Sequence, residues 1–241
     1  LLGALSVFRE PIELEALTEQ GLNIDELDSL VESGLARHAD SDTYDVHDLI
    51  REFLLQSLEK QAKEELHSKA VSWYQKQSSS SQIALELIHH LISSSRHEDA
   101  ANLIVEQGRD LIKEGHIELL GLLESVDTKS VGAESACRID RLRGEVLALL
   151  GRFDEAEEAF SQARPPAEAA GLEDVIADIH SNLADIALKR GDSESSLGMH
   201  RKALELFISI GDAIGAARSY NNMGYILRRN GDKNKALEAY S

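Results

Sequence analysis

The 241-residue chain is poor in cysteine and proline and lacks any long apolar run. Its one cysteine, Cys137, excludes an internal disulfide and any metal site built from several cysteines. A helix needs roughly 20 consecutive apolar residues to span a bilayer, so we expect no membrane contact. The apolar start, residues 1–8, has no basic leader and no cleavage motif. We therefore expect a cytoplasmic protein, and a sequence that begins partway through a domain.

Motifs for catalysis and phosphate binding are missing as well. The sequence has no G-x-x-x-x-G-K-[ST] phosphate loop, no G-x-S-x-G motif and no histidine–carboxylate pattern of zinc enzymes. We expect no catalytic residue, no metal and no cofactor in this chain. His89 and His90 are adjacent and are expected to point to different sides of their helix. Arg138 and Arg141 could lower the pKa of Cys137, but an ordinary helix position is the preferred interpretation.

The chain does have a helix-forming composition and an internal repeat. Apolar residues make up 42 % of it, which excludes a disordered chain, and Ala, Leu and Glu are abundant. Three segments, starting at residues 141, 181 and 221, align with an offset of 40 residues. Gly151, Gly191 and Gly231 fall in register, each after an amphipathic stretch. Glycines in this position end helices because they adopt positive φ without strain.

Small and aromatic residues recur around these glycines. The recurring positions are Gly144, Ala184 and Gly224 before the glycines, Ala156 and Ala236 after them, and the aromatic residues Phe160 and Tyr240. The spacing puts the small residue and the aromatic residue on one face of a second helix. Each unit is thus expected to be a helical hairpin that stacks on its neighbours into a solenoid. The pattern resembles the tetratricopeptide repeat (TPR) family, in its long-helix variant.

Two features depart from that family pattern. The middle repeat has Ser196 and His200 where the alanine and the aromatic residue are expected. Pro165 and Pro166 are predicted to end or kink the second helix of the first repeat near residue 164. The sequence stops at Ser241 inside a helix of the third repeat, so we expect more repeats to follow in the natural protein.

The first 60 residues follow a different pattern. Three short helices are expected, then two short strands around a polar turn at residues 40–42, then a longer helix from about Asp48. This order describes a winged-helix domain. Residues 61–135 read as further helices, including a degenerate hairpin that turns at residues 93–96. We predict a mainly α fold with a winged-helix domain (1–60), a helical adaptor (61–135) and three TPR repeats (136–241).

A winged helix commonly binds DNA, but the charge of this segment argues against it. Residues 1–77 carry 16 Asp and Glu against 7 Lys and Arg, and the whole chain has a net charge of −18. The helix that would enter the major groove, within residues 23–34, has four carboxylates and no basic residue. Base edges and phosphates are read by Arg, Lys, Asn and Gln. We therefore expect no direct contact with nucleic acid.

The string "VHDLIREFL", residues 46–54, carries a second resemblance. With its surrounding helices it is similar to the winged-helix module of signal-transduction ATPases with numerous domains (STAND), the NB-ARC and maltose-activator class. It matches their Met-His-Asp motif, with Val46 for the methionine. The resemblance implies that His47 contacts the β-phosphate of ADP in a nucleotide domain absent from this chain, and that Asp48 supports it. From the residues alone, the preferred interpretation is that Asp48 caps the helix while His47 plugs the hairpin end.

The concave face of the repeats is the predicted binding surface for a protein or peptide. By register, its side chains are Arg138, Arg141, Glu145, Asp178, Ser181, Asn182, Asp185, Arg218, Asn221, Asn222, Tyr225 and Arg228. The family resemblance implies that Asn182 and Asn222 grip the backbone of an extended partner, while Leu142 stands at their position in the first repeat. The four arginines form a basic strip on an acidic chain, which suits an acidic peptide.

Two functions fit these features. The chain is either the sensor part of a multidomain signalling ATPase that binds ADP or ATP elsewhere and forms an oligomer on activation, or a stand-alone adaptor. In an adaptor, residues 1–60 would be a simple cap whose apolar face is covered. A transcriptional regulator would need a DNA-binding domain outside this chain.

Overall fold

A computed structural model describes residues 2–19, 21–40 and 42–240 of the chain. It is mainly helical and divides into two compact units, Leu1–Gln107 and Gly108–Ser241. The division falls inside helix α7 (His97–Glu114), whereas the sequence predicted boundaries at residues 60 and 135. Among the helices described, none combines the length and the apolar character that a bilayer crossing requires.

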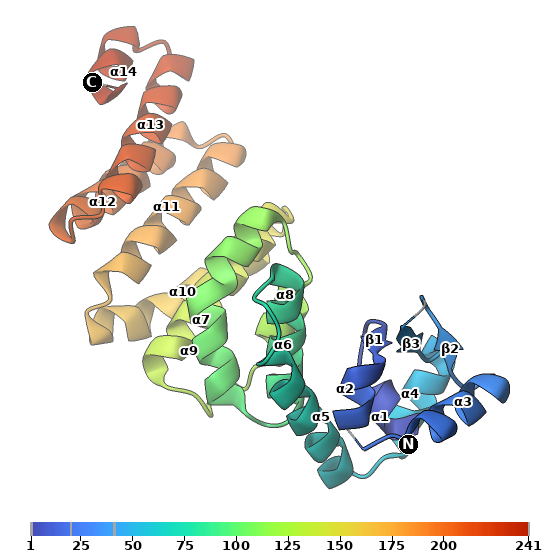
Figure 1. The fold of residues 1–241 in the computed structure, drawn as a ribbon. Coiled ribbons are helices and arrows are strands. Elements are labelled where there is room, and N and C mark those ends of the chain that lie inside the picture. The colour runs from blue at the N-terminus through green and yellow to red at the C-terminus, as the bar shows by residue number, and fades with distance from the viewer. Residues whose placement is uncertain (1, 20, 41, 241) are drawn as a thin grey trace. The chain divides into compact units, whose positions relative to one another are not determined.

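The first unit begins with short helices and a small sheet (Figure 1). Its elements are α1 (Leu2–Ser6), β1 (Ile12–Glu13), α2 (Leu14–Glu19), α3 (Ile24–Glu32), β2 (Arg37–His38), β3 (Thr43–Asp45), α4 (Asp48–Ser57), α5 (Lys60–Tyr74) and α6 (Ser81–Ser93). The three strands are antiparallel in the order β1-β3-β2. The three short helices and the β2–β3 hairpin confirm the sequence prediction, although part of the predicted turn, residue 41, lies outside the described residues. Strand β1 was not predicted.

A single apolar core joins the N-terminal helices to α5. Phe8, Leu17 and Val46 are buried in it together with Trp73 and Tyr74 from the C-terminal end of α5. The sequence placed a domain boundary before α5 because the helical pattern changes there. The aromatic side chains of α5 instead complete the core of the preceding segment.

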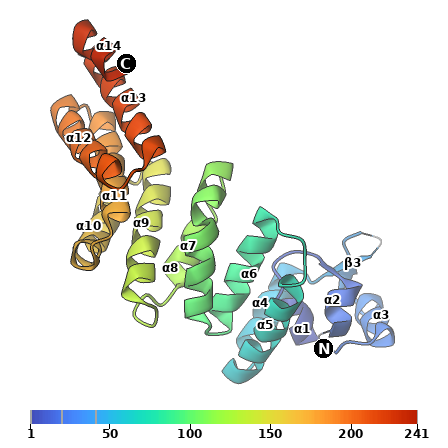
Figure 2. The same ribbon diagram turned by 60° about the vertical axis from the view of Figure 1, so that its left-hand side comes forward.

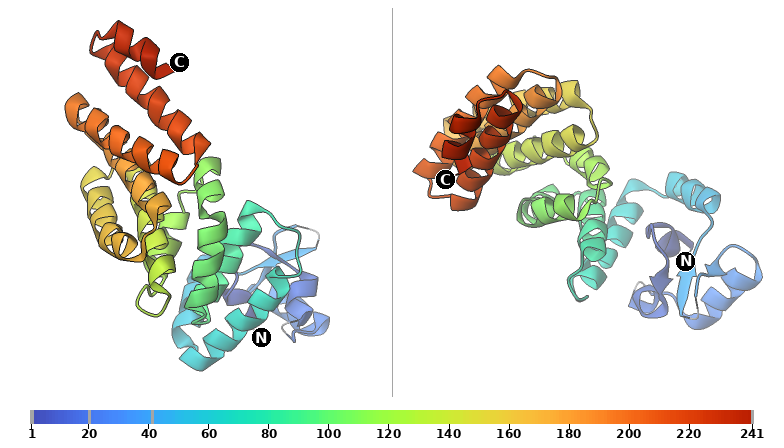
Figure 3. Two further views of the ribbon diagram at one scale, coloured as in Figure 1. Left: turned by 90° about the vertical axis from the view of Figure 1, so that its left-hand side faces the viewer. Right: turned by 90° about the horizontal axis from the view of Figure 1, so that it is seen from above.

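The second unit is a series of antiparallel helical hairpins (Figure 3). Its helices are α8 (Leu119–Ser125), α9 (Ala133–Leu149), α10 (Phe153–Ala170), α11 (Glu173–Lys189), α12 (Ser193–Ser209), α13 (Ala213–Arg229) and α14 (Lys233–Tyr240). Each helix packs against the next, and the first helices α9 and α11 of consecutive repeats also pack against each other. The TPR-like repeat predicted from the 40-residue period is therefore present.

Glycine sets both the turns and the close helix crossings, as the repeat pattern predicted. Gly151, Gly191 and Gly231 have φ values of 76°, 88° and 92°. An added Cβ at Gly144 would lie 2.5 Å from a ring carbon of Phe160 on the partner helix. The small residue is required because the aromatic ring of the second helix lies directly on the backbone of the first.

Pro165 and Pro166 do not end helix α10 near residue 164, so this part of the prediction is wrong. The helix continues to Ala170 and ends where Gly171 adopts a left-handed conformation with φ 67°. The two prolines lie away from the buried face, which carries Ala163 and Ala167 on either side of them. Backbone carbonyls left without an N–H partner there can be hydrated, and packing of the alanine face holds the helix together.

Candidate partner-binding groove

A groove of about 550 Å³ lies on the second unit. Its walls come from the first helices of the three repeats, α9, α11 and α13, and from the end of α7. The lining residues are Arg109, Lys113, Glu145, Ala148, Leu149, Asp178, Ser181, Asn182, Asp185, Ile186, Leu188, Lys189, Asp212, Ile214, Gly215 and Arg218. Four lining side chains are cationic and four are carboxylates, so the groove is neutral on a strongly acidic chain.

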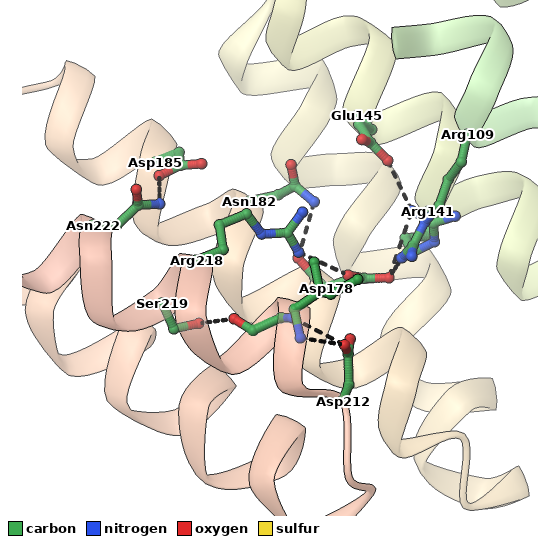
Figure 4. Close-up of polar contacts among 12 residues, drawn as sticks. Arg109, Arg141, Glu145, Asp178, Asn182, Asp185, Asp212, Arg218, Ser219 and Asn222 are labelled. Carbon is green, nitrogen blue, oxygen red and sulfur yellow. Dashed lines mark hydrogen bonds and ion pairs between the residues drawn. The ribbon is translucent and has the colours of Figure 1, made fainter. Parts of the chain in front are cut away.

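Asp178 on α11 is the electrostatic centre of the groove. Its side chain is only 5 % exposed and faces guanidinium groups from three other helices (Figure 4). Arg218 Nη2 lies 3.4 Å from its Oδ1, Arg141 Nη1 lies 3.8 Å from its Oδ2, and Arg109 forms an ion pair with the same Oδ2. A carboxylate this deeply buried is stable only when cations compensate its lost hydration. These contacts tie α7, α9, α11 and α13 together.

The predicted arginines differ in what they can do. Arg141 is buried and donates to Glu145 Oε2 at 2.8 Å, and burial lowers its pKa to about 10. It remains charged at neutral pH but acts as support for Asp178 beneath the surface. Arg218 and Arg109 are about half exposed, so each can turn part of its guanidinium toward a bound partner.

Of the two predicted asparagines, Asn182 lines the groove and Asn222 does not, and both are held by internal hydrogen bonds. Asn182 Nδ2 donates to the backbone carbonyl of Asp178 at 2.9 Å. Asn222 Nδ2 donates to Asp185 Oδ1 at 3.3 Å, across from α13 to α11 (Figure 4). An amide offers a donor and an acceptor together, which matches a peptide unit.

The remaining predicted residues do not line the groove. Arg138 donates to Asp174 at 2.6 Å and to Glu134 at 3.1 Å. Arg228 lies over the ring of Tyr225 at 5.8 Å, and Asn221 is exposed on the same helix. The predicted basic strip is therefore broken up, because each of its arginines already has a carboxylate or an aromatic partner.

Helix α7 also contributes to the groove, which the repeat pattern does not predict. Arg109 and Lys113 are four residues apart, so they share one helix face, and both line the groove. The signal was present in that spacing, but residues 61–135 have no repeat register that could place it. Leu149 and Ile214, exposed by 60 % and 83 %, add apolar surface to the same groove.

The His47–Asp48 pair begins helix α4 in the first unit. His47 is the N-cap, and its Nδ1 accepts from the backbone N–H of Leu49 at 3.4 Å. Asp48 is the first residue of the helix, so the alternative in which Asp48 caps it and His47 plugs the hairpin is wrong in detail. Both side chains are exposed. Asp48 accepts from Arg51 Nη1 at 2.6 Å.

Arg51 also connects this helix to the sheet. Its Nη2 donates to Asp45 Oδ1 at 2.5 Å, while Arg37 Nη2 donates to Asp45 Oδ2 at 2.6 Å and the Val46 amide donates at 2.7 Å. Burial opposes the charged form of Asp45, but these hydrogen bonds and cations outweigh it and hold its pKa below the usual value. The start of α4 is thereby fixed to the hairpin.

Cys137 on α9 has no feature of a reactive thiol. It is fully buried, and burial raises its pKa in spite of Arg138 and Arg141 nearby. The interpretation of Cys137 as an ordinary helix position fits this environment.

Comparison with known proteins supports the repeat assignment. The tetratricopeptide repeat family model matches residues 175–241, and no curated protein matches the chain. Similar solved structures include a Signal Transduction ATPase with Numerous Domains (STAND) protein with a tetratricopeptide repeat sensor from Pyrococcus horikoshii, at 20 % identity and a TM-score of 0.48. That match covers 99 % of this chain but 42 % of the other, so the chain spans less than half of that protein's length.

Two further structures are similar to the chain. MamA protein has 13 % identity and a TM-score of 0.49, covering 74 % of this chain and 88 % of that one. BtubC from P. vanneervenii has 18 % identity and a TM-score of 0.43, covering 93 % and 86 %. Together with the hairpins and the glycine register, the family match identifies the C-terminal part of this chain, residues 175–241, as tetratricopeptide repeats.

Proposed function

We propose that this chain is the partner-sensing part of a multidomain signalling ATPase of the STAND type, and that the groove binds an extended, acidic peptide segment of a partner protein. The observation that carries the proposal is the groove itself. It is lined by the first helices of consecutive repeats and combines amide, cationic and exposed apolar side chains.

The asparagines provide the recognition of backbone. The internal hydrogen bond of Asn222 is long, 3.3 Å, and joins this half-buried side chain to the exposed Asp185. Replacing this bond by a hydrogen bond to a peptide unit of the partner costs little free energy, because a hydrogen bond contributes only about 1 kcal/mol to stability. Asn182 lies one repeat earlier at the same helical position, so the two amides suit an extended segment.

The arginines provide the preference for acidic residues. Asp178 carries one negative charge, which does not neutralise the three positive charges of Arg109, Arg141 and Arg218. The carboxylate of Glu145 compensates the charge of Arg141. A carboxylate of the partner that approaches the half-exposed Arg109 and Arg218 would complete the compensation. Bonds from guanidinium groups to carboxylates are among the stronger hydrogen bonds in proteins.

The first unit favours the signalling ATPase over a stand-alone adaptor. Its helix and strand order supports the winged-helix assignment. Next to His47, Leu49 and Phe53 are exposed by 72 % and 69 % on one face of α4. A simple cap would have this face covered, whereas a domain that docks onto a nucleotide-binding domain would expose it until docked. The exposed carboxylates of α3 again argue against DNA as the ligand.

Within this proposal, partner binding stabilises an open form in which His47 releases ADP held by the nucleotide domain. The coupling is reciprocal, so ADP weakens partner binding by the same factor. We propose a cytoplasmic protein that oligomerises once open, with ADP or ATP as a ligand of the full-length protein only. Replacement of His47 by alanine in the full-length protein should shorten ADP retention; unchanged retention would refute its role.

Selection from a random peptide display library tests the groove. The wild-type chain should enrich acidic sequences, and an Arg218→Ala/Asn222→Ala double variant should lose at least tenfold in affinity for them. Arg201→Ala is the matched control, because Arg201 is an exposed arginine on α12, outside the groove lining. Enriched peptides that bind the double variant as well as the control variant would refute the proposed site.

A further inference from the structure

Helices α5 and α6 of the first unit pack against each other (Figure 2). Three histidines from these two helices converge. One nitrogen from each of His67, His89 and His90 lies within 4.8 Å of the others. The expectation that His89 and His90 point to different sides of their helix is therefore wrong. Consecutive side chains on a helix are about 100° apart, and His67 of α5 faces both. Ring centroids are 5.0–5.6 Å apart across the cluster.

The packing around the cluster fixes the ring orientations. The ring of His90 stacks on Tyr74 at 5.4 Å and meets the edge of Phe8 at 5.5 Å. His67 and His90 are 6 % and 0 % exposed, whereas His89 is half-buried. Donor nitrogens held in place in this way lose little freedom when they bind a ligand.

The hydrogen bonding of the cluster is incomplete. His67 Nδ1 and His90 Nδ1 are 2.8 Å apart, so one donates and the other accepts. His90 Nε2 is buried and has no hydrogen-bond partner among the described residues. A buried polar atom without a partner is costly, so a ligand that bound this nitrogen would stabilise the cluster.

Burial disfavours the charged form of the three rings. It lowers the pKa of His67 to about 4 and that of His89 to about 3, and it lowers the pKa of His90 as well. Lys63 and Arg9 are the nearby cations, and Glu86 compensates Arg9 through a 2.7 Å ion pair.

We propose that His67, His89 and His90 form a binding site for one transition-metal ion of the zinc class. Imidazole nitrogens suit Zn²⁺, Cu²⁺, Ni²⁺ and Co²⁺, whereas Mg²⁺ and Ca²⁺ need oxygen ligands. Zinc–nitrogen bonds of about 2.0–2.1 Å place tetrahedral ligand atoms about 3.3 Å apart. The nitrogens would reach that spacing through small ring movements, because they already lie within 4.8 Å of one another. The bound ion would clip α5 to α6.

Titration of the whole chain with Co²⁺ and Zn²⁺ tests the site. We expect one equivalent of Co²⁺ to bind with the intense visible absorption of a four-coordinate ion, and Zn²⁺ to displace it. The chain's single tryptophan, Trp73, lies six residues after His67 on α5, a distance of about 9 Å along the helix. Its fluorescence should therefore be quenched by Co²⁺ and restored by Zn²⁺.

Two variants separate this site from adventitious binding. His89→Ala should weaken binding at least a hundredfold, and His89→Gln, which fills the same space, should do likewise if the alanine variant does not fold. His116→Ala is the control, because His116 lies between Glu114 and Glu118 and could hold a metal at the surface. The proposal is overturned if 0.1 mM Zn²⁺ leaves the wild-type chain unbound, or if binding survives His89 replacement and is lost with His116.

Discussion

Two helical glycines of the repeats test how closely the paired helices approach each other. At Gly144 in α9, an added Cβ would lie 2.5–2.8 Å from three ring carbons of Phe160, which is fully buried and cannot move away. At Gly198 in α12, an added Cβ meets nothing within 4 Å. Both positions are inside helices, so alanine improves the helix by about 1 kcal/mol at each. They differ only in the space around them.

The difference sets the sign of the two effects. Forcing an extra carbon into a packed core costs about 1–3 kcal/mol. Gly144→Ala should therefore lower the free energy of unfolding by about 1 kcal/mol, while Gly198→Ala raises it by about 1 kcal/mol. For a unit of this size, that separates the two thermal midpoints by roughly 8 °C.

Thermal unfolding followed by far-ultraviolet circular dichroism measures the effect. Hydrogen exchange of the amides in α9 and α10 shows whether the loss of stability lies in these two helices. A double-mutant cycle of Gly144→Ala with Phe160→Leu should show a coupling energy of about 1 kcal/mol, because the two side chains would touch. Midpoints that shift in the same direction for both alanine variants would refute the close crossing as the reason for glycine at position 144.

Further predictions concern buried polar groups. Ser196→Ala should raise the thermal midpoint and the unfolding free energy by about 1 kcal/mol, because the buried hydroxyl has no hydrogen-bond partner in the described residues; an unchanged or lower midpoint would contradict this. Asp45→Asn should destabilise the first unit by about 2 kcal/mol at pH 7, measured by Trp73 fluorescence in urea. Folding lowers the pKa of Asp45, so the difference in stability between the wild type and this variant is present at pH values above the usual pKa of 3.8 and should disappear at pH values below it. A stability difference that does not change with pH would refute the ion pairs of Asp45 as its cause. Asp178→Asn should lower the unfolding free energy of the second unit by about 3 kcal/mol, because it leaves Arg141 buried with Glu145 alone; a loss below 1 kcal/mol in chemical denaturation would contradict that role.

The features that the sequence could predict are those set by local or periodic patterns. The glycines at 151, 191 and 231 determine where helices end, because only the backbone at that residue matters. The same holds for the small residue and aromatic ring of each hairpin, whose spacing follows from helix geometry. The β2–β3 hairpin has a strand alternation and a polar turn, which are also local signals.

The features that the sequence could not predict depend on contacts between segments that are distant in the chain. Strand β1 is two residues long and exists because it pairs with β3, so its own sequence reads as helix. Pro165 and Pro166 break the local rule, and packing of the alanine face overrides them. In the groove, Asp178 meets Arg109 from a helix outside the repeat register. His67 meets His90 from 23 residues away, which no local pattern in the sequence encodes.

The polar residues of the middle repeat connect its packing to the groove. Ser196 and His200 are fully buried at positions where the neighbouring repeats have alanine and an aromatic ring. His200 Nε2 lies 3.3 Å from Asp185 Oδ1, off the direction of a good hydrogen bond, and Asp185 also accepts from Asn222. A phenyl ring like that of Phe160 would offer no polar atom to Asp185. Departures from a packing pattern lower stability and are therefore retained mainly where function requires them. In the middle repeat, His200 departs from the pattern next to Asp185, a groove carboxylate that accepts a hydrogen bond from Asn222, so the choice of His200 is better explained by the groove than by the core.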